Sequence, residues 1–294
     1  MREFTIEEGW GARRIASELE RGGFIRSAFV FVVVANMADS GGSLKAGTYE
    51  LSPSLSTWEI VELIASGSAK NTDIQITIPE GMNVWEIDEL LQREKLIVPG
   101  SFARTYAQDE GSLYPDTYRF DESIRLTANR FDNARTIGAV LQKEFNARTS
   151  HATREQTIIA SMLEKEAKTA EDMAIVAGIM KKRQEIGMPL QIDATVAYGW
   201  CLARWLPMSS TKNCDVTQAP LATEIKVDGP YNTYTRIGLP RGPISNPGAT
   251  ALKAAANPKE SPYLYYLSTR DGGSIIYSRT HAEHLANRFK YLGF

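Results

Sequence analysis

The stretch most informative about chemistry is residues 157–168, TIIASMLEKEAK, which carries two glutamates near its end. Its apolar stripe runs through Ile159, Met162 and Leu163. Spacing of i+3 and i+4 places Glu166 next on the same helix face. A carboxylate that ends an apolar stripe lies at the edge of the core or in a cleft. Desolvation there raises its pKa and makes it a usable general acid near neutral pH.

Glu164 is the second candidate in this segment. It points away from the stripe, and Lys168 at i+4 would hold it ionised. We therefore predict Glu166 as the catalytic acid and keep Glu164 as its alternative. The competing interpretation is a solvated helix end in which neither carboxylate has a catalytic role, because perturbed carboxylates are a minority on helices.

Polar groups that could hold a substrate lie further along the chain. From residue 198 onward the sequence is rich in Gly, Pro, Asn and Tyr, a composition typical of an open groove for a hydroxyl-rich ligand. Turn and helix-capping chemistry explains the same residue types equally well. The predicted binding residues are Gln191, Asp193, Thr195, Tyr231, Asn232, Tyr234 and Asn246.

The elements expected to position these side chains begin with an internal repeat. Residues 4–25 (FTIEEG and an amphipathic segment) match residues 76–97 (ITIPEG and a similar segment). Each copy predicts a short strand, a glycine turn and a helix. A strand at residues 47–51 and a helix at 57–65, closed by Ser66 and Gly67, are predicted between the copies. The repeat predicts a small α+β domain over residues 1–107.

Helices dominate the expected second domain, residues 108–294. Three helical patterns cover residues 128–149, 154–168 and 170–186. Near the end, residues 262–267 and 274–277 predict a β-hairpin across the turn 270–273. The predicted fold class is therefore α+β, with a small N-terminal domain, a helix-rich catalytic domain and a C-terminal hairpin region.

Composition excludes several classes of partner. With 33 Lys and Arg against 35 Asp and Glu, the net charge is −2, and no basic stripe is present for a nucleic acid. The most apolar run, residues 28–35, is shorter than the roughly 20 residues of a membrane span, and we interpret it as a buried strand or helix.

The HAEH motif (281–284) lacks a further ligand at metal spacing and predicts a helix start with exposed imidazoles. We expect no metal and no cofactor.

The two cysteines, Cys201 and Cys214, lie in a segment that resembles a surface excursion. They form either a disulfide, in an oxidising compartment, or two free thiols, and the sequence leaves both open.

Several separate motifs, in the same order, resemble those of the endolytic murein transglycosylase (YceG-like) family over nearly the whole chain. They are GTY (47–49), IPEG (78–81), EG (110–111) with Leu113, PDTY (115–118), ASMLEKEA (160–167), LQIDATV (190–196), YNTY (231–234), GLP (238–240) and GPISNPG (242–248). The chain differs from the family at Ser112, in the excursion 201–214 and in lacking an N-terminal anchor helix.

The resemblance implies an enzyme that cuts peptidoglycan glycan strands between N-acetylmuramic acid (MurNAc) and N-acetylglucosamine (GlcNAc) without water. It implies a LysM-like glycan-binding domain at the N-terminus and one essential glutamate on the EKE helix, which we assign to Glu166. It further implies action at the outer face of the cytoplasmic membrane beside peptidoglycan synthases. Either this chain is cytoplasmic or its anchor lies upstream of the residues given.

One carboxylic acid is enough for such a reaction, because the same group first donates a proton and then accepts one. A conventional muramidase would need a second carboxylate, for which Asp193, Asp116 and Glu110 are candidates. A third hypothesis is a non-catalytic protein that binds the wall and recruits a synthase.

Overall fold

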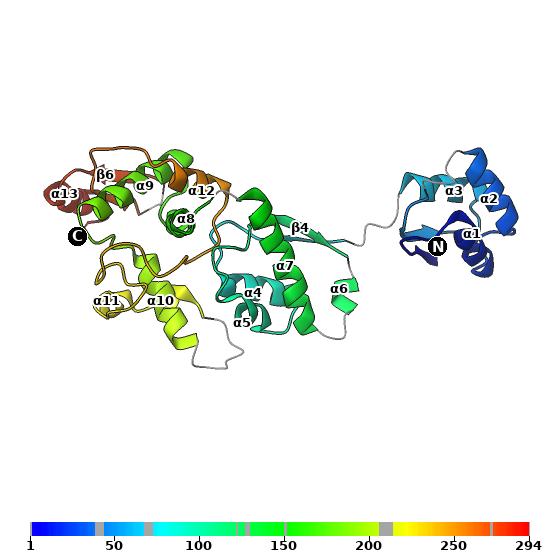
Figure 1. The fold of residues 1–294 in the computed structure, drawn as a ribbon, viewed down its shortest axis with the longest axis horizontal. Helices are drawn as coiled ribbons and strands as arrows, with labels where there is room; N and C mark the ends of the chain where they lie inside the picture. Colours follow the sequence, from blue (N-terminus) through cyan, green and yellow to red (C-terminus); the bar gives the residue numbers. More distant parts are fainter. Residues whose placement is uncertain are drawn as a thin grey trace. The chain divides into compact units, whose positions relative to one another are not determined.

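The computed structural model of the protein describes residues 2–38, 44–67, 73–121, 123–126, 130–149, 152–205, 214–270 and 273–293. The chain divides into two compact units, Met1–Ile74 with Phe120–Glu122, and Gln75–Arg119 with Ser123–Phe294 (Figure 1). Helices and small two-stranded sheets make up both, which confirms the α+β class. Within the described residues, no helix is long and apolar enough to cross a bilayer.

The first unit is a strand, two helices, a strand and a further helix. The outer strands β1 and β2 pair antiparallel, with Ile6 opposite Gly47. The predicted helix at 57–65 is confirmed: Ser56 caps its start through a capping box, and Gly67 ends it at φ 73°. The elements are β1 (Arg2–Ile6), α1 (Ala12–Arg21), α2 (Ala28–Met37), β2 (Gly47–Leu51) and α3 (Thr57–Ser66).

Helix α2 contains the apolar run at 28–35, and only part of that run is buried. Phe31 and Ala35 lie in the core of the first unit, whereas Phe29 is 77% exposed. The prediction of a buried segment is therefore correct for one face of the helix alone.

The second unit begins with the other copy of the repeat, and the strand, glycine turn and helix predicted for each copy are confirmed. This copy comprises β3 (Ile74–Thr77), α4 (Val84–Arg93), α5 (Ser101–Tyr106) and β4 (Thr117–Phe120), with β3 paired to β4. Its order of elements, strand–helix–helix–strand, repeats that of β1 to β2.

Matching contacts show that the two copies share one local structure. Thr5 Oγ1 lies 3.0 Å from Thr48 Oγ1 across the first pair of strands, and Thr77 Oγ1 lies 2.9 Å from Thr117 Oγ1 across the second. In the later strand of each copy, the threonine (Thr48 or Thr117) is followed by a tyrosine. Tyr49 donates its hydroxyl to the Lys45 carbonyl at 2.7 Å, and Tyr118 donates to the Tyr114 carbonyl at 2.6 Å.

The predicted boundary at residue 107 does not coincide with the division in the structure, which lies at residue 74. Residues 75–107 belong to the second unit because β3 pairs with β4, beyond residue 107. In addition, the backbone N–H of Val84, at the start of α4, donates to buried Glu110. Sequence similarity between the copies grouped them together, but each copy folds with its own neighbours.

The rest of the second unit is mainly helical, and the three predicted helical patterns correspond to α7, α8 and α9 (Figure 1). The predicted hairpin is confirmed as β5 and β6, with Tyr265 opposite Ser278, while residues 271–272 of its turn lie outside the described residues. The elements are α6 (Ser123–Leu126), α7 (Arg130–Arg148), α8 (Arg154–Glu166), α9 (Ala170–Glu185), α10 (Asp193–Trp205), η1 (Val216–Gln218), α11 (Leu221–Glu224), α12 (Ala249–Ala256), β5 (Tyr265–Ser268), β6 (Ile275–Ser278) and α13 (His281–Leu292).

Helix α8, which carries both candidate glutamates, packs against α9 and α12 (Figure 1). It begins at a capping box on Thr153 and ends at Glu166, because Ala167 is extended (φ −142°, ψ 151°). Met162 and Leu163 of the predicted stripe are fully buried and Ile159 is partly buried, but Ala160 and Ser161 outside the stripe are fully buried as well. Glu166 therefore lies at the last position of a rigid, well-anchored helix.

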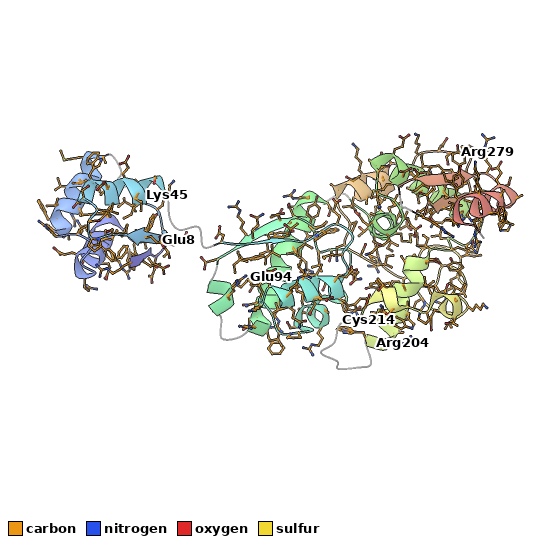
Figure 2. The ribbon with its side chains drawn as sticks, turned by 180° about the vertical axis from the view of Figure 1, so that it is seen from behind. Glu8, Lys45, Glu94, Arg204, Cys214 and Arg279 are labelled. Atoms are coloured by element: carbon orange, nitrogen blue, oxygen red, sulfur yellow. A yellow bond between two sulfur atoms is a disulfide. The ribbon has the colours of Figure 1, made fainter. Side chains whose placement is uncertain are left out.

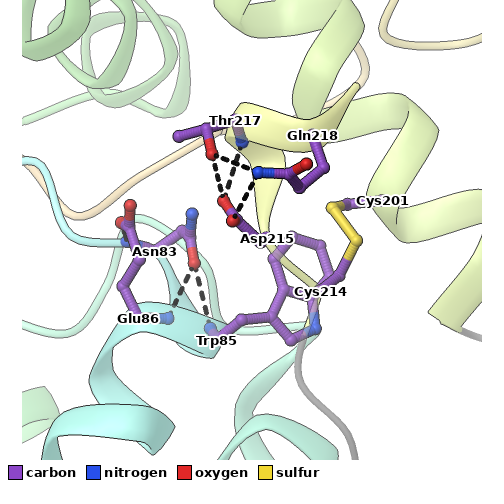
Figure 3. Close-up of a disulfide and its surroundings, with 8 residues drawn as sticks. All are labelled: Asn83, Trp85, Glu86, Cys201, Cys214, Asp215, Thr217 and Gln218. Carbon is purple, nitrogen blue, oxygen red and sulfur yellow. Dashed lines mark hydrogen bonds between the residues drawn. A yellow bond between two sulfur atoms is a disulfide. The ribbon is translucent and has the colours of Figure 1, made fainter. Parts of the chain in front are cut away.

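Cys201 and Cys214 are joined by a disulfide, with their Cα atoms 5.6 Å apart. This settles the choice that the sequence left open. Cys201 is buried on α10, while residues 206–213 of the excursion lie outside the described residues (Figure 3).

Candidate active site

A pocket of about 470 Å³ opens at the end of α8. Glu166 lines this pocket and is half-buried. The other lining residues come from α9, the loop before α10, the loop at residue 234, and the C-terminal hairpin and helix. Its polar lining includes Arg183, Gln191, Asp193, Tyr234, Tyr266 and His284. The volume lies within the range typical of small-ligand sites.

The surroundings of Glu166 raise its pKa to about 7, and burial is the main cause. The negative charge of Asp193 raises the pKa of Glu166 further. A hydrogen bond from the Tyr266 hydroxyl to Glu166 Oε2, 2.9 Å long, and the positive charge of Arg183 act in the opposite direction. At neutral pH this carboxyl therefore populates both its acid and its carboxylate form.

Tyr266 comes from strand β5. Its own pKa is raised well above the ordinary value by burial and by the neighbouring Glu166. The phenol consequently stays neutral and remains a hydrogen-bond donor. The antiparallel pairing of β5 with β6 holds this donor in place.

Arg183 is a nearly buried cation on α9 that ties the walls of the pocket together. Its Nε donates to the Leu264 carbonyl at 2.7 Å and its Nη1 to the Leu190 carbonyl at 2.6 Å. Its guanidinium carbon also lies 5.2 Å from the ring centre of Tyr265. Arg183 thereby fixes the start of the hairpin and the loop before α10, and its charge acts on Glu166.

Glu164 has a different environment. It is half-buried and is absent from the lining of this pocket. Its Oε1 accepts the backbone N–H of Gly248 at 2.8 Å, and burial raises its pKa. This contact fixes the loop before α12 to α8, which is a structural role.

A profile of the YceG-like family matches residues 4–290. The chain belongs to this family. It is 27% identical to the endolytic murein transglycosylase of Bacillus subtilis (strain 168), with 98% of this chain and 84% of that protein aligned. It is 24% identical to the endolytic murein transglycosylase of Streptococcus pneumoniae (strain D39), with 96% of this chain aligned to 57% of that longer protein. The crystal structure of a yceG-like protein from Listeria monocytogenes has a TM-score of 0.53, 26% identity, and coverage of 97% of this chain and 98% of that chain.

Of the predicted binding residues, this YceG-like chain places three in the pocket beside Glu166. They are Gln191, Asp193 and Tyr234. The Tyr234 hydroxyl donates to Asp193 Oδ1 at 2.5 Å, which orients the carboxylate. Gln191 adopts a left-handed backbone at φ 56°, and its N–H donates to the Thr233 carbonyl.

The other four predicted binding residues have structural environments and are absent from this pocket. Thr195 and Asn246 are fully buried, and Asn232 is 5% exposed. Asn232 donates to three backbone carbonyls of residues 224–227 and caps the turn that follows it. Tyr231 is 9% exposed, with its ring 5.1 Å from that of Tyr198. The contacts of these four residues are those of turn capping and core packing, which was the alternative interpretation of their residue types.

Asn246 lies at the centre of a separate cluster of buried hydrogen-bonded residues. Its Oδ1 accepts the backbone N–H of Gly111 at 2.9 Å, and its Nδ2 donates to Glu110 Oε1 at 2.7 Å. Burial raises the pKa of Glu110 to about 8. Glu110 also accepts from the N–H of Val84 and the hydroxyl of Tyr198. This cluster links the second repeat copy to the helical part of the unit.

The three candidates for a second carboxylate therefore separate. Asp193 shares the pocket with Glu166, Glu110 belongs to the buried cluster, and Asp116 pairs with Arg148 at 2.8 Å. Of these three, only Asp193 lines the pocket that contains Glu166.

The sequence interpretation missed the wall that the C-terminal hairpin and α13 contribute. Besides Tyr266, it contains Tyr265, with the His284 ring 5.4 Å away and nearly parallel. HAEH does begin a helix, but both its histidines line the pocket and His284 is half-buried. The available signal was the run YLYYL (263–267), which places several tyrosines on one hairpin strand. In the described residues there is no group of three or more His, Cys, Asp or Glu suited to a metal ion.

Proposed function

We propose that this protein is an endolytic lytic transglycosylase that cleaves the β-1,4 bond between MurNAc and GlcNAc in peptidoglycan strands. The observation that carries the proposal is Glu166, a half-buried carboxyl with a pKa of about 7 in a polar pocket. The names of the relatives, endolytic murein transglycosylase, support the substrate class. Cutting within nascent strands would terminate or trim them.

In the proposed mechanism, Glu166 acts in turn as acid and base. Its protonated form gives a proton to the glycosidic oxygen, so that the bond to the anomeric carbon of MurNAc breaks and GlcNAc leaves with a free hydroxyl. The resulting carboxylate accepts the proton of the MurNAc C6 hydroxyl, whose oxygen bonds to the anomeric carbon. A 1,6-anhydro ring forms, no water is consumed, and Glu166 is again protonated.

The neighbours of Glu166 suit both halves of this cycle. Asp193 and burial favour the acid form, while the Tyr266 hydroxyl and Arg183 stabilise the carboxylate once it has formed. Asp193 also carries the negative charge that would stabilise positive charge developing on the sugar. Gln191 and Tyr234 provide polar groups at the pocket wall to orient the sugar hydroxyls.

A conventional muramidase is the second candidate, and one observation favours it. Asp193 lies in the same pocket as Glu166 and interacts with it electrostatically. A retaining or inverting hydrolase needs such a second carboxylate. The origin of the oxygen at the new sugar end separates the two reactions.

For the first unit we propose a LysM-like role in binding glycan. Its strand–helix–helix–strand order and paired outer strands support this proposal. A purely non-catalytic scaffold would use the same unit to bind the wall. In that case a Glu166→Gln protein would bind glycan, and would replace the wild-type protein in cells that lack it, as well as the wild-type protein does.

We further propose that the protein works at the extracytoplasmic face of the bacterial cytoplasmic membrane, together with peptidoglycan synthases. The Cys201–Cys214 disulfide supports this compartment because such bonds persist in oxidising surroundings. The proposed substrate also lies there.

The test replaces each glutamate of the EKE motif separately. Glu166→Gln keeps the side-chain volume but cannot donate the proton, so glycan cleavage should fall on the order of a hundred- to ten-thousandfold while binding persists. Glu164→Gln is the matched control, because its amide oxygen can still accept from Gly248. Activity is measured on purified glycan strands. Loss of cleavage in Glu164→Gln, with near-full activity in Glu166→Gln, would overturn the assignment.

A further inference from the structure

A second pocket, of about 340 Å³, lies along the same face of α10 as the candidate active site. Asp193, at the start of α10, lines the first pocket, while Val196, Gly199, Trp200, Ala203 and Arg204 line the second. Positions 193, 196, 200 and 203 follow helical spacing and form one stripe. Trp200 lies about 10 Å beyond Asp193 along the helix axis, a distance close to the length of a disaccharide.

One loop forms the opposite wall of both pockets. Tyr234 lines the first pocket, and residues 227–232 line the second. Gly199 allows this loop to approach the helix closely, since a Cβ there would lie 2.8 Å from Tyr231 Cβ. Asp228 and Arg236 brace the loop through hydrogen bonds of 2.8 and 2.7 Å. The second pocket therefore shares one helix and one loop with the site that contains Glu166.

The lining of the second pocket suits a sugar. Trp200, which is partly exposed, provides aromatic surface that packs against the C–H faces of sugar rings and keeps polar edges accessible. Arg204 lies over Trp200 at 4.5 Å and faces Glu224 at 3.8 Å, and its side chain is half-exposed. These charged groups can hydrogen-bond to hydroxyl and acetamido groups.

The disulfide holds the outer wall of this pocket. Cys201 follows Trp200 on α10, and Cys214 begins the segment that contains Asp215, η1 and Glu224 of α11 (Figure 3). Both η1 and α11 pack on α10. Figure 2 labels Arg204 near the end of α10 and Cys214 beside this helix.

We propose that this second pocket is a glycan subsite that binds the strand about one disaccharide away from the bond that is cut. The proposal rests on the proposed function, because it takes the ligand to be the same glycan strand. It gives the disulfide a specific role, which is to keep the subsite wall in place.

The experiment measures oligosaccharide binding in a Glu166→Gln background by calorimetry, with a disaccharide and a hexasaccharide of GlcNAc as probes. The hexasaccharide should bind more tightly than the disaccharide. Trp200→Ala should weaken hexasaccharide binding about tenfold, the loss expected for one aromatic contact, and leave disaccharide binding unchanged. Phe131→Ala, which removes an aromatic residue that is 53% exposed on α7, is the control and should change neither affinity.

Reduction of the disulfide offers a second measurement that leaves Trp200 intact. The chain has two cysteines, so a reductant acts on this bond alone. Reduction should lower the affinity for the hexasaccharide and leave the affinity for the disaccharide unchanged. Equal affinities of the two probes, or an unchanged hexasaccharide affinity in Trp200→Ala, would overturn the subsite but leave the proposed function intact if wild-type protein still cuts glycan. Absence of both binding and cleavage would overturn both proposals.

Discussion

At the scale of single residues, the two glutamates of one motif differ because their surroundings differ. Glu166 ends α8 and faces a pocket, with Tyr266 and Asp193 beside it. Glu164, two positions earlier, accepts a backbone N–H from another loop. Both carboxyls are partly desolvated, so a raised pKa alone does not separate them. The two residues differ in access to the pocket, because Glu166 lines it and Glu164 does not.

The neighbours of Glu166 predict a change in the pH profile. Asp193→Asn removes a negative charge that raises the pKa of Glu166, so the loss of activity at high pH should move to lower pH. Tyr266→Phe removes a hydrogen bond that lowers this pKa, so the same limb should move to higher pH. Cleavage rates measured from pH 5 to 9 test the opposite shifts.

Each of these variants keeps the acid, so the maximal rate should stay within about tenfold of wild type, whereas losing a catalytic carboxyl costs a hundredfold or more. A loss of that larger size in Asp193→Asn would favour the hydrolase with two carboxylates.

The position of Glu166 at the edge of the core could be predicted from the sequence because helix periodicity links it to Met162 and Leu163, which are buried. Arg183 could not be identified in this way. Its contacts with Leu190 and Leu264 depend on tertiary packing, and its own helix pattern resembles an ordinary solvated end. Asn246 and Thr195, which were predicted to bind the substrate, are buried and hydrogen-bond to backbone groups, and a sequence pattern does not separate such a role from contact with a ligand.

At the scale of elements, the same turn serves different purposes in the two repeat copies. Gly9 and Gly81 both have positive φ, 85° and 79°. Nothing lies within 4 Å of a Cβ built at Gly9, whereas a Cβ at Gly81 would lie 3.1 Å from Glu164 Cβ. Gly81 also donates its N–H to the Asn246 carbonyl. The second copy is thus part of the support for α8.

This difference predicts unequal effects of matched alanine variants. Both substitutions introduce backbone strain of about 1 kcal/mol or more at a positive φ. Only Gly81→Ala should also displace α8 and lower the cleavage rate, because its Cβ meets Glu164. Cleavage assays and thermal melts of both proteins provide the measurement. Equal activity losses in Gly9→Ala and Gly81→Ala would show that the contact with α8 has no catalytic consequence.

At the scale of the whole molecule, the fold class and most elements could be predicted, but the division of the chain could not. The copies were recognised from FTIEEG and ITIPEG, and each forms the expected strand, turn and helix. The boundary depends on pairing between β3 and β4, which are separated by two helices. Threonine and tyrosine recur at 48–49 and at 117–118, and this match was the available sign that the second copy continues past residue 107.

The revised boundary predicts the behaviour of two fragments. Residues 75–294 contain the whole second unit together with residues 120–122 of the first unit, and this fragment should fold and retain chemistry on short strands. Its binding to long glycans should weaken because the proposed glycan-binding unit is absent.

The shorter fragment, 108–294, should fail to fold. It lacks fully buried core side chains of α4, Ile87 and Leu91 among them, and the Val84 N–H that reaches Glu110. Circular dichroism and cleavage assays on both fragments test this. A folded 108–294 fragment with an unchanged rate would contradict the division described here.

We propose that one carboxyl, Glu166, carries out the cleavage without water. The most direct test is mass analysis of the sugar ends released from purified glycan strands in water enriched in ¹⁸O. We expect 1,6-anhydro-MurNAc ends without ¹⁸O, because the MurNAc C6 hydroxyl supplies the oxygen. Reducing ends that carry ¹⁸O would show hydrolysis and would contradict the claim.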